Sequence, residues 1–168
     1  MVQAEGEIHG SYFKQVMSAM MTAEYTLPEL SKEVSELDER TWYPLQIFSD
    51  MLYKVAEKMP PIVMCKIGRN IFLAAQDTLL KFGFDTFDKL GRDVSITLTG
   101  IVRKVDPKKI QKTNYWSSNK AIIAYSKITP AAYSEGIIRG ALQMYKKILL
   151  NFEITENGDF NIFTLEFN

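Results

Sequence analysis

Two glycines inside one strongly helical stretch constrain this chain more than any other sequence feature. The segment GIIRGALQMYKKIL, residues 136–149, has apolar residues at helical spacing, yet it keeps Gly136 and Gly140 on one face. Each interior glycine costs a helix about 1 kcal/mol relative to alanine. Together with Ala132, at positions i, i+4 and i+8, they form a smooth groove that another backbone can approach closely. The sequence therefore predicts a helix over about 132–150 that packs against a close neighbour.

Two kinds of neighbour satisfy this groove. One is a helix expected from Pro61 to near Gly83, which is apolar around much of its circumference and carries its own Gly68. The other is a partner subunit. Internal packing is the simpler interpretation, and a dimer contact or a ligand channel along the glycine face stays open as an alternative.

The order of predicted elements gives the fold class. Helices are expected over 10–25, 26–37, 38–59 and 61–83, and four short β-rich segments follow: 108–116, 120–128, 151–155 and 160–167. Phe163, Leu165 and Phe167 should share one face of the last strand. We therefore expect an α+β domain: an N-terminal region of about five helices, packed with a C-terminal four-stranded antiparallel sheet that one helix interrupts.

The segment 86–103 has two competing patterns. Val94, Ile96 and Leu98 alternate with polar residues as in a strand, whereas Phe87, Leu90, Val94, Leu98 and Ile101 keep helical spacing. Because the helical pattern is the longer one, we expect the fifth helix here.

Composition limits the location and the partners of the chain. It has 168 residues, which we expect to form one domain, with residues 1–8 as a flexible tail. Lys+Arg and Asp+Glu are 20 each, so no net charge attracts nucleic acid or an anionic membrane. No apolar run is long enough to span a bilayer, and the N-terminus does not resemble a signal peptide. A single cysteine and no signal peptide favour a cytoplasmic protein.

Residues for catalysis or metal binding are sparse. Cys65 and His9 are the only Cys/His pair and lie far apart in sequence, and Cys65 is expected in the apolar interior of a helix. The acidic residues Asp85, Asp88 and Asp93 are best explained as a solvated helix surface. We therefore expect no enzyme, no catalytic residues and no metal site.

Three segments of this chain resemble segments of a known superfamily, and they follow one another along the chain in the same order as in that superfamily. The segment GIIRGALQMYKK resembles the LRGALEM stretch of TRAPP vesicle-tethering subunits. The segment CKIGRNIFLAAQDTL resembles the NIGxRLIEDFL helix of the same subunits, and TNYWSSNKAIIAYSKI resembles their TNWS…FSLIL hairpin. The superfamily includes the 4-vinyl-reductase-like domains and the haem nitric-oxide-binding domains, and WYPLQIF is similar to an uncharacterised bacterial-type branch. The resemblance implies a helix over 86–103.

The ligands that these relatives carry do not transfer position by position. The haem branch uses a mid-chain histidine and a Tyr-x-Ser-x-Arg motif, whereas this chain has only His9 and Tyr125-Ser126-Lys127. The TRAPP branch acylates a cysteine just before the fifth helix, where this chain has LLKFGFDTF. We therefore expect no cofactor and no haem, with a non-covalent apolar or lipid-like ligand as an open alternative.

The resulting functional hypothesis is a non-enzymatic regulatory or scaffolding module. It binds a small apolar ligand in a buried pocket, acts on an unidentified protein partner, and forms a homodimer through its helices. The alternative is a haem-based gas sensor with a non-histidine ligand, such as a tyrosine or Cys65. The ligand-binding residues predicted from the sequence are Cys65, Phe72, Trp116, Gly136 and Gly140.

Overall fold

The N-terminal half of the chain combines a small sheet with a group of helices. The computed structural model describes residues 2–168. Strand β1 (Glu7–His9) pairs antiparallel with β2 (Trp42–Pro44) on one side and β3 (Val102–Arg103) on the other. The helices of this half are α1 (Ser11–Ser18), α2 (Ala23–Thr26), α3 (Pro28–Ser35) and α4 (Leu45–Lys58). Their apolar stripes meet in one core, which includes the fully buried Val16, Leu52 and Val55.

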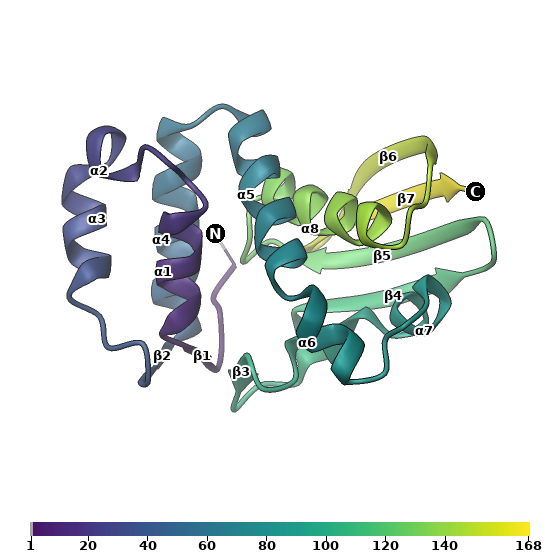
Figure 1. Ribbon diagram of the computed structural model, residues 1–168, viewed down its shortest axis with the longest axis horizontal. Helices are drawn as coiled ribbons and strands as arrows, with labels where there is room; N and C mark the ends of the chain where they lie inside the picture. Colours follow the sequence, from purple (N-terminus) through teal and green to yellow (C-terminus); the bar gives the residue numbers. More distant parts are fainter. Residues whose placement is uncertain (1) are drawn as a thin grey trace.

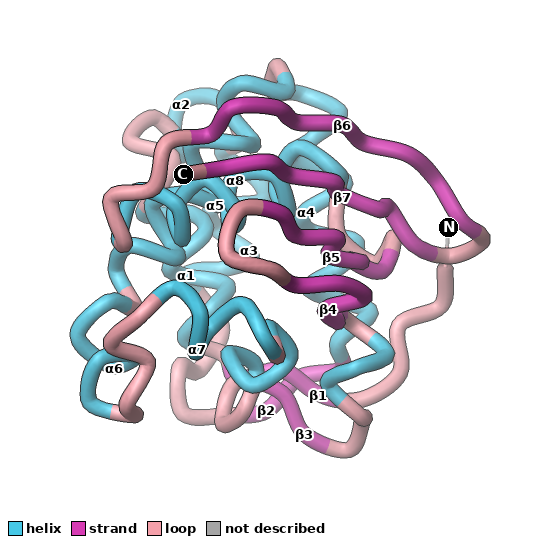
Figure 2. Tube along the Cα trace, turned by 90° about the vertical axis from the view of Figure 1, so that its right-hand side faces the viewer, coloured by secondary structure: helices cyan, strands magenta, loops and turns pink. Residues whose placement is uncertain are grey.

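The C-terminal half is built on a four-stranded antiparallel sheet in the order β4-β5-β7-β6 (Figure 2). The strands are β4 (Gln111–Trp116), β5 (Lys120–Ser126), β6 (Leu149–Asn157) and β7 (Phe160–Phe167). Strand β7 alternates buried and half-buried residues, as a strand with one face on a core should. Phe163, Leu165 and Phe167 lie on its buried face, which confirms their predicted arrangement.

Two long helices connect the halves. Helix α8 (Ala131–Met144) covers one face of the sheet, and α5 (Pro61–Ala74) packs on α8 between the sheet and the N-terminal helices (Figure 1). After α5 the chain continues through α6 (Gln76–Lys81), α7 (Phe87–Arg92) and the 3₁₀ turns η1 (Val94–Leu98) and η2 (Pro107–Lys109). The α+β fold class, with helices packed on an antiparallel sheet, is thereby confirmed.

The glycine face of α8 packs on α5 within the same chain, which decides between the two neighbours. A Cβ on Gly136 would overlap the carbonyl oxygen of Cys65, and a Cβ on Gly68 would overlap the carbonyl oxygen of Tyr133. A Cβ on Gly140 would lie 2.9 Å from the Cβ of Phe72. Backbone therefore meets backbone at this contact, and only glycine has the shape that permits it.

The predicted helices differ from the structure in their bounds: residues 38–59 contain strand β2 before α4, and residues 61–83 divide into α5 and α6. Residues 10–25 divide into α1 and α2, and residues 86–103 divide into α7, the 3₁₀ turn η1 and strand β3. The helical pattern was correct for 87–92, but the β-branched run VSITLT prefers tighter or extended backbone. Helix α8 ends at Met144 rather than near 150, because Lys146 has a positive φ of 55° and the next residues enter β6.

The predicted tail and the predicted dimer face also change. Residues 7 and 8 of the expected flexible segment 1–8 belong to β1, and Ile8 is 4% exposed, so the tail prediction is wrong at that end. Met1 lies outside the described residues. Met17 and Met20 are buried in the core, whereas Met21 is 96% exposed. A charge at Met17 is therefore expected to unfold the domain rather than to disrupt an association.

We predict that alanine in place of Gly136 or Gly68 destabilises the domain by about 1–3 kcal/mol. Overpacking against a carbonyl oxygen outweighs the gain of about 1 kcal/mol in helix propensity. Gly140→Ala should cost less, because its Cβ would lie 2.9 Å from the Cβ of Phe72 and 3.0 Å from the carbonyl oxygen of Arg69, a smaller overlap than at Gly136 or Gly68. Urea unfolding of the three variants measures this order, and equal or increased stability of Gly136→Ala would contradict the packing.

Candidate functional site

A buried cavity lies where the two halves of the chain meet. It has a volume of about 120 Å³, close to that of an engineered cavity that stays dry and binds benzene. Ten helices and strands from both halves line it, so it does not exist in either half alone. Its lining is mostly aliphatic and aromatic: Ile8, Tyr12, Leu45, Phe48, Ser49, Ile71, Phe72, Ala75, Leu79, Thr97, Leu98, Ile101, Val102, Ile110, Gln111, Tyr125, Ile128, Thr129, Tyr133, Ser134 and Ile137.

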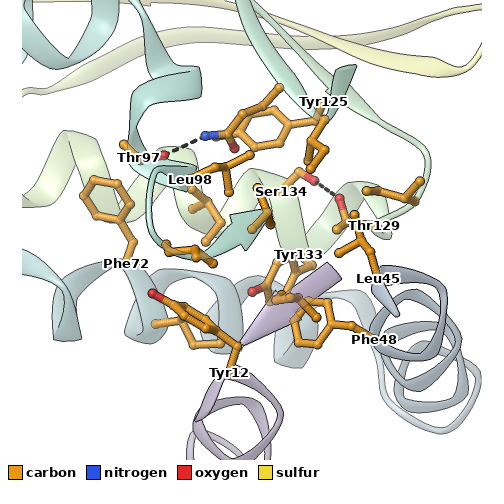
Figure 3. Close-up of a pocket in the computed structure, with 18 of the residues that line it drawn as sticks. Tyr12, Leu45, Phe48, Phe72, Thr97, Leu98, Tyr125, Thr129, Tyr133 and Ser134 are labelled. Atoms are coloured by element: carbon orange, nitrogen blue, oxygen red, sulfur yellow. Dashed lines mark hydrogen bonds between the residues drawn. The ribbon is translucent and has the colours of Figure 1, made fainter. Parts of the chain in front are cut away.

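Hydrogen bonds from buried side chains fix the walls. The Gln111 amide of β4 donates to the carbonyl of Val94 and to the hydroxyl of Thr97, both at 2.6 Å, which ties η1 to the sheet. The Ser134 and Thr129 hydroxyls lie 2.8 Å apart at the start of α8 (Figure 3). Because these polar groups are paired with protein partners, the wall that they form is held in one arrangement.

Two further hydrogen bonds tie the N-terminal helices to the sheet. Ser49 of α4 donates to the carbonyl of Ile128 at 2.6 Å, and Tyr53 donates to the carbonyl of Lys127 at 2.7 Å. Ser49 is 1% exposed, so its hydrogen bond is made away from water. The position of α4 is therefore coupled to the β5–α8 connection.

Three tyrosines give the cavity its polar character. Figure 3 shows Tyr125 across the pocket from Tyr12, with Tyr133 between them. Tyr125 and Tyr133 are 6% and 7% exposed, and Tyr12 is half-buried. Burial raises the pKa of Tyr12 to about 12, and it raises the pKa of Tyr125 and of Tyr133 as well. The three phenols therefore line the cavity as neutral groups that can both donate and accept a hydrogen bond.

The lining carries no charge. Among residues 2–168, those that line the cavity include no Lys, Arg, His, Asp or Glu, and no Cys or Met. Within the same described range, no group of three or more His, Cys, Asp or Glu is placed to hold a metal ion, and no helix is long and apolar enough to cross a membrane. The cavity is therefore suited to a neutral or largely apolar guest.

The residues predicted from the sequence are brought together only in part. Phe72 lines the cavity, whereas Gly136 and Gly140 lie at the α5–α8 contact beside it. Trp116 packs on α7, where a Cβ on Gly91 would overlap its ring, and its indole donates to Asp88 at 2.8 Å. Trp116 therefore fills the junction of helix and sheet and does not line the cavity.

Cys65 and His9 also lie outside the cavity lining. Cys65 is half-buried on α5, and burial, followed by the charge of Glu135, raises the pKa of its thiol. His9 is half-buried in β1, with its Nδ1 2.8 Å from the Ser11 hydroxyl and its ring in edge contact with Trp42. Neither side chain faces a guest in the cavity.

Sequence reasoning missed the three tyrosines as a set. They come from α1, β5 and α8, and more than a hundred residues separate Tyr12 from Tyr125. A weak signal did exist: Tyr125 and Tyr133 occupy positions that are buried in a strand and in a helix, where a hydroxyl needs a reason to be present.

Comparison with known proteins places the fold. No protein-family profile and no curated protein matches the sequence. Solved structures do match: an H-NOX protein from S. oneidensis in the Fe(II)NO state aligns with a TM-score of 0.64 at 16% identity, over 96% of this chain and 99% of that one. An Fe(II) unliganded H-NOX mutant from K. algicida aligns with a TM-score of 0.65 at 9% identity, over 96% and 97%.

A third match is an oxygen-binding H-NOX domain related to soluble guanylate cyclases, with a TM-score of 0.57 at 14% identity, over 95% and 91% of the two chains. This chain therefore has the H-NOX fold over nearly its full length. Of the superfamily resemblance, the haem nitric-oxide-binding branch is the part that the structures support. The TRAPP and 4-vinyl-reductase branches find no such support among these structures.

The expectation that this chain takes no haem is corrected by these matches. Solved domains that share its fold carry Fe(II) with NO, CO or oxygen, so haem has to be considered as a ligand of this fold. The residues of the cavity fit haem in their apolar character, and their phenols are a known class of haem-iron ligand. In its present form the space is close to benzene in size, so a porphyrin requires the walls to move apart.

We predict that stability falls steeply between about pH 10 and pH 12 and that Tyr12 contributes to this fall. The pKa of Tyr12 is about 12 in the folded chain against a usual 10, so the unfolded chain loses this proton first as pH rises. Between those values each pH unit removes about 1.4 kcal/mol through this group. Urea unfolding at a series of pH values should show that the free energy of unfolding falls less steeply with pH in Tyr12→Phe than in the native chain. Tyr25→Phe is the control, because Tyr25 is 87% exposed.

Proposed function

We propose that this chain is a non-enzymatic, ligand-responsive regulatory domain, and that the cavity between its two halves is the ligand site. The observation that carries the proposal is that three phenols, of the buried Tyr125 and Tyr133 and the half-buried Tyr12, line an otherwise apolar space. A buried hydroxyl without a partner costs about 1–3 kcal/mol, so phenols that line an apolar space favour a guest that can form hydrogen bonds with them.

The position of the cavity supports a regulatory role. Tyr12, Phe48 and Ile8 belong to the N-terminal half, whereas Tyr125, Ile128 and Ile110 belong to the sheet half. A guest that contacts both sets stabilises one relative placement of the halves by its differential affinity for that placement. Ser49 and Tyr53 hold α4 to the β5–α8 connection and would transmit such a change.

Haem is the first candidate ligand, because solved domains of this fold carry Fe(II). The haem iron, when bound, supplies a site for a diatomic gas. In this chain the group would lie among the aliphatic residues of the cavity, and Tyr12, Tyr125 or Tyr133 would be its protein ligand. This candidate is a gas sensor with a tyrosine in place of the histidine that the resemblance implies.

A small neutral molecule is the second candidate, and a specific observation favours it. No charged side chain lines the cavity among the described residues, so the carboxylates of a haem would find no cation there. The volume of about 120 Å³ also suits a guest of benzene size without movement of the walls.

The two candidates are distinguished by an absorbance titration. If haem is the ligand, we expect a sharp visible band that saturates at one haem per chain and that is lost in one of Tyr12→Phe, Tyr125→Phe or Tyr133→Phe. Loss in a single variant identifies the iron ligand, because phenylalanine keeps the ring and removes only the oxygen. Tyr53→Phe, outside the cavity lining, is the control.

If the ligand is a neutral molecule instead, haem should give weak, non-saturating absorbance, while small neutral aromatics such as phenol raise the melting temperature by mass action. If neither haem nor a small neutral aromatic binds, and the three tyrosine-to-phenylalanine variants are as stable as the native chain, the cavity is not a ligand site.

We also propose that the domain acts through protein contacts and forms a homodimer. Met21 and Tyr25, on the segment between α1 and α3, are 96% and 87% exposed, and apolar side chains of this size favour association. Sedimentation at high micromolar concentration measures the subunit number, and a strictly monomeric chain would refute the dimer.

A further inference from the structure

A second, larger space lies next to the cavity and opens to the surface. This groove has a volume of about 720 Å³ and is formed by α1, the end of α5, α6 and the segment 96–101. Five residues line both the groove and the cavity: Tyr12, Ala75, Leu79, Thr97 and Ile101. We call these five residues the neck, because they lie between the inner space and the outer one.

The groove shares the chemistry of the cavity. No charged residue lines it within residues 2–168, and two large apolar side chains are exposed at its wall, Phe82 at 73% and Ile96 at 42%. Apolar side chains exposed around a hollow are typical of a binding groove rather than of an ordinary surface. A guest therefore meets uncharged, mostly apolar walls from the surface to the phenols.

The dimensions select an elongated guest. The inner space holds a group of about benzene size, whereas the groove beyond the neck is several times larger. Small side chains, Ala75 and Thr97, contribute to the neck, and Leu79 is the buried residue of the short helix α6. A flexible alkyl chain passes such a neck more easily than a wide rigid ring system.

Resting on the proposed function, we infer that the ligand is a neutral, straight-chain amphiphile. Its hydrogen-bonding head lies among Tyr12, Tyr125 and Tyr133, and its alkyl chain passes the neck into the groove. A hydroxyl, carbonyl or amide head satisfies the phenols, which donate and accept. A carboxylate or ammonium head is disfavoured, because the inner space offers it no opposite charge.

The test is displacement of the neutral fluorescent probe N-phenyl-1-naphthylamine by a series of straight-chain alcohols, from butanol to tetradecanol. In the native chain, affinity should rise by about fourfold per methylene beyond the length that fills the cavity, since each buried methylene contributes a constant increment. In Ala75→Phe the rise should stop at that length, because the ring closes the neck. Gln76→Phe, at an exposed position next to Ala75 that lines neither the cavity nor the groove, is the matched control.

The head group is tested at fixed chain length. The alcohol should bind more tightly than the carboxylate or the amine, and Tyr133→Phe should weaken the alcohol by about two- to tenfold, the value of one or two hydrogen bonds. Circular dichroism checks that each variant folds. Ile101→Phe, which narrows the neck from another side, replaces Ala75→Phe if the latter does not fold.

Each outcome decides a separate point. Affinity that levels off at butanol in the native chain would overturn the inferred chain in the groove and leave the cavity as the ligand site. Equal binding of carboxylate and alcohol would overturn the neutral head. Failure of every alcohol together with stoichiometric haem binding would overturn this ligand class while the proposed function stands. Failure of alcohols and haem alike would refute both.

Discussion

The backbone contact between α5 and α8 is the constraint on which the rest of this structure depends. Gly136 and Gly68 let each helix place its backbone against a carbonyl of the other, and no residue with a Cβ fits at either position. Gly136 and Gly140 together cost α8 about 2 kcal/mol in helix propensity. Close packing between α5 and α8 offsets that cost. Since α8 lies on the sheet and α5 contacts the N-terminal helices, this contact sets the spacing of the two halves.

That spacing produces the cavity. Ile71 and Phe72 of α5 and Tyr133 and Ile137 of α8 flank the glycine contact and form one wall. The opposite walls come from η1 and α4, which are held by Gln111 and Ser49. A close contact at one place thus holds a space open at another, because rigid helices cannot also converge beside it. The hydroxyls of Tyr12, Tyr125 and Tyr133 then favour a ligand that can form hydrogen bonds inside the cavity.

The fold and the lining give different information about the ligand. The H-NOX fold, shared with solved Fe(II) domains at 9–17% identity, makes haem a candidate that sequence motifs alone had led us to reject. The lining, neutral and with phenols as its polar groups, favours a neutral guest. Fold follows from the packing of elements, whereas ligand chemistry follows from a few side chains, so the two can diverge between proteins of one fold.

The sequence by itself determined the fold class, the internal glycine contact as one of two options, and the buried face of β7, because periodicity and glycine placement are local properties. It did not determine where the segment 86–103 changes from helix to 3₁₀ turn and strand, since its two patterns overlap. Only the tertiary structure brought Tyr12, Tyr125 and Tyr133 together around one space. Their proximity depends on how α1, β5 and α8 pack, and no local pattern in the sequence encodes a distance between segments so far apart.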